Sequence, residues 1–196
     1  MRILAIHGVA TGEDDPVATL WQKELRAHGV RCEVSDGRWP STGSFVTDAA
    51  RFADPQFRND AIESVAHAVD DFALGGSGIL LAHSMGTVLL LHAERILRTK
   101  FPILCLASPL SNPLIWPTLH AIGFGRPPAL PVIHIWNDDD PIPGGNNAHQ
   151  PDYFLATRIA VADNEAKQYL TEHDARAYLR HPHTHRALGL LSERIS

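Results

Sequence analysis

Residues 78–92 are Gly-Ile-Leu-Leu-Ala-His-Ser-Met-Gly-Thr-Val-Leu-Leu-Leu-His, an apolar run that breaks at a small-x-Ser-x-Gly turn and then resumes. The first half suits a buried strand and the second half suits a helix, so the stretch predicts a strand, a tight turn and a helix. Such a turn would present Ser84 at an exposed point and requires small neighbours, here Ala82 and Gly86. The same pattern also fits an ordinary helix start that Ser84 merely caps.

Ser84 is a candidate nucleophile because a strand-to-helix turn leaves room for a histidine to take its proton. The first N–H groups of the following helix point to the same place, so the N–H of Met85 is a candidate oxyanion donor. A predicted strand at residues 2–6 is followed by His7, Gly8 and Val9. The glycine lets the backbone turn toward the nucleophile, and we expect the N–H of Val9 to complete an oxyanion hole with that of Met85. We expect His7 to be a structural hydrogen-bonding residue rather than a base.

Length and composition indicate one globular domain, residues 1–196, because a chain of this size buries about 70% of its unfolded surface. The apolar content of 44%, the charged content of 20% and the net charge of -5 are typical of soluble proteins and argue against nucleic-acid binding. The N-terminal apolar run is too short for a signal peptide, and no run approaches the ~18 residues of a membrane span. We therefore expect a cytoplasmic protein without an integral membrane segment; the sequence carries no signal for an oligomeric state.

Apolar periodicity predicts alternating strands and helices. Besides the elements at residues 2–6 and 78–92, we expect strands at 30–34, 102–107, 131–136 and 157–162, and helices at 16–28, 59–74, 84–98 and 183–195. The β-α-β opening favours an α/β fold with a mostly parallel central sheet flanked by helices on both faces. We expect a loop at residues 36–56, and at residues 108–128 a crossover helix packed on the sheet in preference to a substrate-facing lid. Cys32 and Cys105 are expected in strands as buried apolar residues without a disulfide.

Acidic residues follow the strand predicted at residues 131–136, where the chain continues Asn137-Asp138-Asp139-Asp140-Pro141. Substrates of helix-and-parallel-sheet proteins bind at the carboxyl ends of the strands, so one of these carboxylates is a candidate to orient an imidazole. A solvated acidic turn or a cation-binding loop is the alternative.

Histidines beyond these carboxylates are the candidate bases, namely His149, His173, His181, His183 and His185. His149 shares a loop with the acid, whereas His173 follows the strand predicted at residues 157–162. The last three also fit a metal-binding tract, but residues at i, i+2 and i+4 do not share one helix face, so we expect no metal site.

Five segments together resemble the α/β-hydrolase superfamily. They are Ile6-His7-Gly8, Ala82-His83-Ser84-Met85-Gly86, Ala107-Ser108-Pro109-Leu110, Trp136-Asn137 with Asp140-Pro141-Ile142, and His173 with Tyr178, Arg180 and Pro182. Within the superfamily they are similar to lipases and esterases related to GPI-inositol deacylases, although Ala82 stands where most members have glycine.

The resemblance implies an α/β-hydrolase fold with a minimal cap and a catalytic triad of Ser84, Asp140 and His173, in that chain order. It also implies a serine esterase that cleaves a small-molecule carboxylic ester without a cofactor. A thioesterase or amidase with the same triad, and a non-catalytic binding module on the same fold, are the alternatives.

Overall fold

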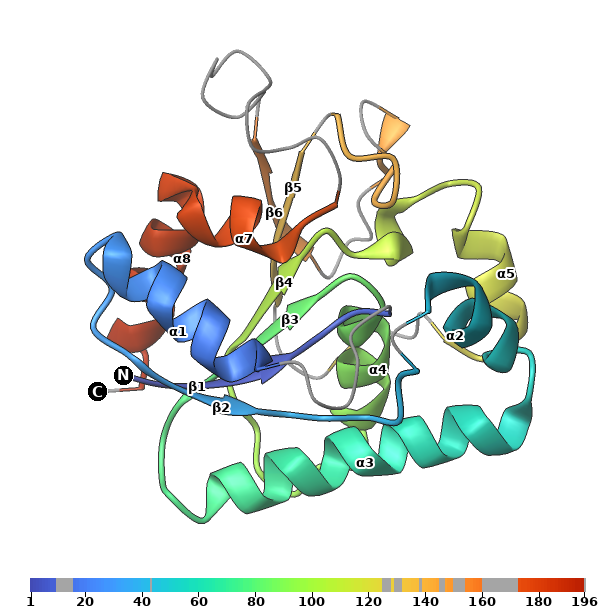
Figure 1. Ribbon diagram of the computed structural model, residues 1–196, viewed down its shortest axis with the longest axis horizontal. Coiled ribbons are helices and arrows are strands. Elements are labelled where there is room, and N and C mark those ends of the chain that lie inside the picture. Colours follow the sequence, from blue (N-terminus) through green and yellow to red (C-terminus); the bar gives the residue numbers. More distant parts are fainter. Residues whose placement is uncertain are drawn as a thin grey trace.

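The computed structural model describes residues 1–9, 16–42, 44–124, 128, 132–137, 139–144, 147–149, 154–159 and 173–195. Within these residues one sheet of six strands has the order β2-β1-β3-β4-β5-β6, and every neighbouring pair is parallel (Figure 1). The strands are β1 (Arg2–Ile6), β2 (Glu33–Asp36), β3 (Ile79–His83), β4 (Ile103–Leu106), β5 (Val132–Asn137) and β6 (Phe154–Ile159). The predicted parallel α/β architecture is therefore confirmed.

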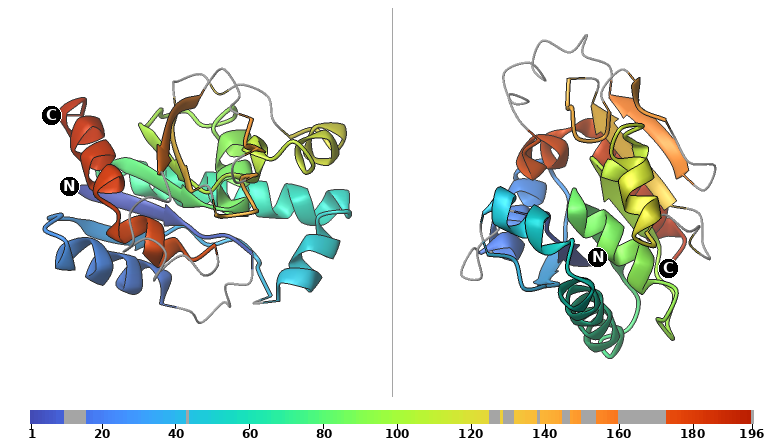
Figure 2. Two further views of the ribbon diagram at one scale, coloured as in Figure 1. Left: turned by 90° about the horizontal axis from the view of Figure 1, so that it is seen from above. Right: turned by 90° about the vertical axis from the view of Figure 1, so that its right-hand side faces the viewer.

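Helices cover both faces of this sheet, as the two views of Figure 2 show. They are α1 (Val17–Ala27), α2 (Phe45–Arg51), α3 (Pro55–Ala73), α4 (Met85–Ala93), α5 (Trp116–Ala121), α7 (Ala175–Arg180) and α8 (Pro182–Glu193), with a 3-10 turn η1 (Pro109–Ser111). Helices α1, α7 and α8 pack on one face, and α3 and α4 pack on the other. None of the described helices is long and apolar enough to cross a bilayer.

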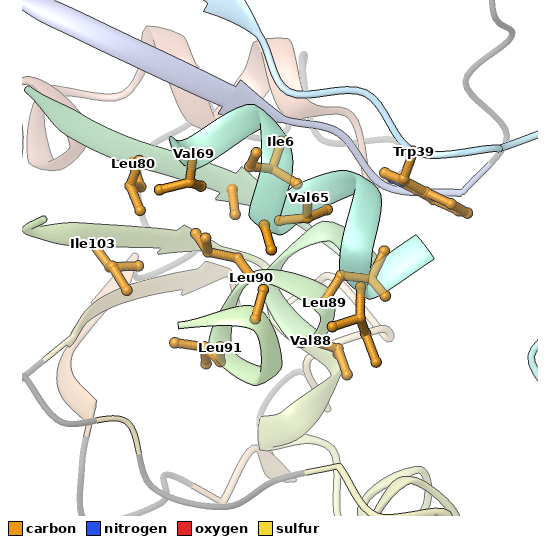
Figure 3. Close-up of a cluster of buried hydrophobic side chains, with 14 of the residues drawn as sticks. Ile6, Trp39, Val65, Val69, Leu80, Val88, Leu89, Leu90, Leu91 and Ile103 are labelled. Carbon is orange, nitrogen blue, oxygen red and sulfur yellow. The ribbon is translucent and has the colours of Figure 1, made fainter. Parts of the chain in front are cut away.

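Two apolar clusters, one on each face, hold the sheet between the helices. Along β3, Leu80 and Ala82 face the α3–α4 side, whereas Ile79 and Leu81 face the α1–α8 side, as the two-residue period of a strand requires. Figure 3 shows side chains of α3, α4 and the strands gathered on the first of these sides. Each fully buried Leu or Ile contributes about 1.5–3 kcal/mol, so a strand with apolar residues on both faces belongs at the centre of the sheet.

The start of β2 differs from the strand expected at residues 30–34. Gly29 ends α1 with a left-handed φ of 83°, and its N–H donates to the carbonyl of Arg26. The Arg26 guanidinium then binds the carbonyl oxygen of Cys32 at 2.8 Å, and residues 30–32 have no regular structure, so β2 begins at Glu33. The prediction that Cys32 lies in a strand is wrong, although both cysteines are buried and free.

Two helices were not expected from the sequence. Helix α2 lies within the predicted loop at residues 36–56, where the Ser44 side chain caps it by accepting from the N–H of Thr47. Helix α7 precedes α8, which begins at Pro182 instead of residue 183. The predicted strand at residues 157–162 overlaps β6, but residues 160–162 lie outside the described residues.

The segment after β4 follows the expectation of a packed crossover over residues 108–124. Helix α5 is short, but Leu119 and Phe124 are buried in the same cluster as α3 and α4. Residues 125–127 lie outside the described part of the chain.

Candidate active site

Ser84 lies in the turn between β3 and α4 and has an unusual backbone conformation. Its φ of 55° and ψ of -130° belong to a sparsely populated region for a residue with a side chain. Surrounding hydrogen bonds hold this conformation in place. The Ser84 N–H donates to the carbonyl of Leu106 at 3.0 Å, and the Ser84 carbonyl accepts from the Thr87 hydroxyl at 2.7 Å and the Thr87 N–H at 3.0 Å.

Two glycines allow this turn to pack against the end of β1. A Cβ on Gly86 would lie 2.3 Å from the carbonyl oxygen of His7, and a Cβ on Gly8 would lie 2.7 Å from the Cβ of Ser84. Neither backbone approach leaves room for a side chain, so the requirement for a small residue after Ser84 is confirmed at Gly86. The expectation of an exposed serine is wrong, since only 4% of the Ser84 surface is accessible.

His173 joins Ser84 to Asp140 through both of its ring nitrogens. Its Nε2 lies 2.6 Å from Ser84 Oγ, and its Nδ1 lies 2.8 Å from Asp140 Oδ2. A carboxylate accepts hydrogen bonds, so Nδ1 carries the ring proton and Nε2 is left to accept the serine proton. The structure thus brings His173 together with Asp140, which lies 33 positions away in the sequence, and with Ser84, which lies 89 positions away.

Asp140 is held in a turn directly after β5 and is 2% exposed. Its N–H donates to the carbonyl of Asn137 at 3.1 Å, and its Oδ1 accepts from the N–H of Ile142 at 2.9 Å. Its Oδ2 accepts a hydrogen bond from the Tyr178 hydroxyl at 2.7 Å as well as the one from His173. The other two acidic candidates differ: Asp139 is exposed, and Asp138 lies outside the described residues.

This chain is similar to known proteins in its fold but not closely in its sequence. No protein-family model matches the sequence, and no curated protein matches it. Est1E of Butyrivibrio proteoclasticus, solved with ferulic acid bound, matches over 99% of this chain and 89% of its own length with a TM-score of 0.57 at 16% identity. SOBER1 of Arabidopsis thaliana matches over 100% of both chains with a TM-score of 0.56 at 11% identity.

A third similar structure is the RedJ thioesterase from the prodiginine biosynthetic pathway of Streptomyces coelicolor. The match covers 98% of this chain and 85% of RedJ, with a TM-score of 0.53 at 16% identity. All three proteins are members of the α/β-hydrolase superfamily. This chain has the α/β-hydrolase fold.

The positions of the three joined residues agree with the order Ser, Asp, His that is typical of α/β-hydrolases. Ser84 follows β3, Asp140 follows β5, and His173 precedes α7. The two hydrogen-bond partners of His173 therefore both lie at the carboxyl end of the parallel sheet, where ligands of open α/β sheets bind.

The oxyanion-hole candidates are backbone N–H groups at the same edge. Met85 is the first residue of α4, so its N–H has no acceptor within the helix. Val9 follows Gly8, which lies against the Ser84 side chain. In the part of the chain that the structure describes, neither N–H donates to a protein acceptor, which leaves both available to a ligand.

The tail histidines do not converge on one point. The rings of His181 and His183 stack with centroids 4.9 Å apart, whereas His185 Nε2 contacts the carbonyl of Leu179 at 2.7 Å. Across the described ranges, no group of three or more His, Cys, Asp or Glu residues is arranged to hold a metal ion.

Two other candidate histidines also have contacts away from Ser84. His149 is exposed, and its backbone N–H donates to the carbonyl of Ser111. His7 lies 2.8 Å through Nδ1 from the carbonyl of Gly8 and stacks on Trp39 with centroids 5.3 Å apart. Burial lowers the pKa of His7, so its ring is neutral in this structural role.

Three further residues shape the site without having been predicted to do so. His83 precedes Ser84, and its ring centroid lies 4.6 Å from that of His173. Burial, followed by the charge of His173, holds the pKa of His83 well below its usual value of 6.5. Asn112 donates to the carbonyls of Pro141 and Ile142 at 2.9 and 3.0 Å. These bonds hold the segment after β4 against the turn that contains Asp140.

Tyr178 is the third of these residues, and its hydroxyl contacts Asp140 directly. It stands five positions after His173, within the segment that carries the resemblance, but no sequence pattern assigns its hydroxyl a partner. Asn112 lacks even such a local signal, because its role depends on a turn 29 residues away.

Proposed function

We propose that this protein is a serine hydrolase that cleaves a small-molecule carboxylic ester through an acyl-enzyme, with residues 1–196 acting as one catalytic domain. Ser84 is the nucleophile, His173 the general base and Asp140 the residue that orients the base. The observation that carries the proposal is the unbroken hydrogen-bonded chain from Ser84 Oγ through His173 to Asp140 Oδ2, at 2.6 and 2.8 Å.

Acylation begins when Ser84 Oγ attacks the ester carbonyl carbon and its proton passes to His173 Nε2. The negative charge on the former carbonyl oxygen is stabilised by the N–H groups of Val9 and Met85. Asp140 accepts from Nδ1 and stabilises the imidazolium. As the tetrahedral intermediate collapses, His173 returns the proton to the alkoxide, and the alcohol leaves.

Deacylation repeats these steps with water as the nucleophile. His173 Nε2 takes a proton from the water as its oxygen attacks the acyl carbon. Collapse of the second intermediate breaks the bond to Ser84 Oγ, which regains a proton from His173. The acid is released, and no step needs a cofactor.

The fold leaves the acyl group open. Similar structures include a thioesterase and a protein solved with ferulic acid bound. The alternatives to an esterase are a thioesterase and an amidase with the same triad. A panel of p-nitrophenyl esters, acyl thioesters and anilides separates these activities, and we expect the highest kcat/KM with the esters.

The test of the triad uses the same assay with Ser84→Ala. Because Ser84 supplies the nucleophile and contributes little packing, the variant should fold like the wild type and lose ester hydrolysis. A folded Ser84→Ala protein that keeps most of its activity would remove Ser84 from the mechanism. A wild-type protein inactive on the whole panel would favour the remaining alternative, a binding module on the hydrolase fold.

A further inference from the structure

We propose that Tyr178 is a positioning residue of this site, whose hydroxyl holds Asp140 and His173 in their reactive arrangement. The inference rests on the proposed function for its effect on turnover, but its structural part can be tested without a substrate. Tyr178 is fully buried on α7, the helix that directly follows His173.

The direction of the Tyr178 hydrogen bond follows from its two neighbours. The N–H of Asn137 donates to the phenol oxygen at 3.2 Å, which leaves the single phenol proton for Asp140 Oδ2 at 2.7 Å. Burial, and then the negative charge of Asp140, raise the pKa of Tyr178 well above its usual value of 10. The phenol therefore stays protonated, and remains a donor to Asp140, throughout the neutral range.

One carboxylate oxygen of Asp140 accepts hydrogen bonds from both His173 and Tyr178 of α7. Asp140 Oδ2 accepts from His173 Nδ1 at 2.8 Å and from Tyr178, while Oδ1 accepts from the N–H of Ile142. Rotation of the carboxylate away from His173 would break the bond to Tyr178 as well. His173 lies two residues before α7, which carries Tyr178. The Tyr178 hydroxyl therefore also fixes the position of α7 relative to Asp140.

Other contacts hold α7 without touching the acid, and they supply a control. Arg180 pairs with Glu24 of α1 at 2.6 Å, and the Thr184 hydroxyl donates to the Tyr178 carbonyl at 2.6 Å. Thr184 is a fully buried residue of α8, so Thr184→Val removes one buried hydrogen bond between α8 and α7 and leaves the contacts of Asp140 unchanged. Thr184→Val removes this one bond and leaves the Tyr178 carbonyl its bond from the His181 N–H, whereas Tyr178→Phe removes the bonds to both Asn137 and Asp140, so Tyr178→Phe should be the more destabilising variant.

Proton NMR gives the readout that a purely structural role would not change. The His173 Nδ1 proton, hydrogen-bonded to Asp140, should give a low-field resonance, which is assigned by its loss in His173→Gln. We expect Tyr178→Phe to shift or broaden this resonance and Thr184→Val to leave it as in the wild type. An unchanged resonance in Tyr178→Phe, or an equal change in both variants, would overturn the proposal.

Ester hydrolysis gives the second readout. Tyr178→Phe should lower kcat about tenfold, the equivalent of one hydrogen bond to a charged group, and leave KM within about twofold. Thr184→Val should change neither constant. Wild-type kcat in a folded Tyr178→Phe protein would contradict a positioning role.

The two proposals fail in different ways. A wild-type protein without esterase activity would remove the proposed function, but the NMR comparison would still decide whether Tyr178 holds the pair. If Tyr178→Phe does not fold, 3-fluorotyrosine in place of the chain's 3 tyrosines tests the same bond, because the more acidic phenol is a stronger donor. The His173 resonance should then move, and an unmoved resonance would contradict the proposal.

Discussion

The turn at Ser84 and the Asp140–His173 side of the site are built in different ways. The Ser84 backbone is hydrogen-bonded to Leu106 and Thr87, and Gly86 packs against the carbonyl oxygens of Ile6 and His7 at the end of β1. Asp140 and His173 lie 33 residues apart in the sequence and are joined by a direct hydrogen bond, and the Tyr178 hydroxyl donates to the same Asp140 oxygen. The first region depends on steric fit, where a single methyl group is too large. The second depends on long-range hydrogen bonds, where the loss of one donor or acceptor changes chemistry more than shape.

The largest effect is expected on the hydrogen-bonded side, at Asp140. Asp140→Asn replaces the acceptor for His173 Nδ1–H with an amide, which favours the wrong imidazole tautomer and should lower turnover about 10⁴-fold with little loss of fold. Asp139→Asn is the matched control because Asp139 is exposed, and its turnover should stay within about twofold of the wild type. Steady-state hydrolysis of a p-nitrophenyl ester measures both. Equal, mild losses would indicate a solvated acidic turn.

A smaller effect, on the free energy of unfolding, is expected in the turn at Ser84. Gly86→Ala places a methyl group against the carbonyl oxygens of His7 and Ile6, which cannot yield without moving β1, so we expect a loss of about 1–3 kcal/mol. Gly189→Ala is the control, because a Cβ there meets nothing within 4 Å and α8 should gain about 0.5–1 kcal/mol. Urea unfolding compares the two. Changes of the same sign would show that the close approach at Gly86 does not limit side-chain size.

The smallest effect concerns the pH dependence of stability. Burial lowers the pKa values of His83 and His7, so below about pH 6.5 the unfolded chain binds protons that the folded protein does not. Neither histidine affects stability above this pH, and each lowers stability as the pH falls below it, because protons then bind the unfolded chain in preference. His83→Phe keeps a ring against His173 and should reduce the slope between pH 6.5 and 5 in urea unfolding. If stability falls with pH equally in the wild type and in His83→Phe, His83 does not contribute to the pH dependence of stability.

Features that depend on neighbouring residues were predictable from the sequence. The strand, turn and helix around Ser84 follow from an apolar run with small residues at Ala82 and Gly86, and the parallel sheet follows from buried strands that alternate with helices. Helix α2 was missed because Gly, Pro and Ser around it read as a loop. The buried Asp48 side chain, which accepts from Ser41 and Thr42, stabilises that region and has no periodic signature.

Features that depend on long-range contacts were less predictable. The residue pattern alone left three adjacent carboxylates and five histidines as candidates, and the resemblance to a family was needed to select Asp140 and His173. What separates Asp140 from Asp139 in the structure is burial beneath His173 and a bond to Tyr178, which lies 38 residues away. No local spacing in the sequence encodes that contact, since it exists only after α7 docks against the sheet.

Covalent labelling with a fluorophosphonate, followed by mass spectrometry of the digested protein, tests whether His173 activates Ser84 as the nucleophile. The probe reacts with a serine only where a base activates it, so we expect a single modified residue, Ser84, in the wild type. His173→Ala should abolish the labelling, whereas replacement of His181, His183 and His185 together should preserve it. A label on another residue, or full labelling of Ser84 in His173→Ala, would contradict the assignment of nucleophile and base.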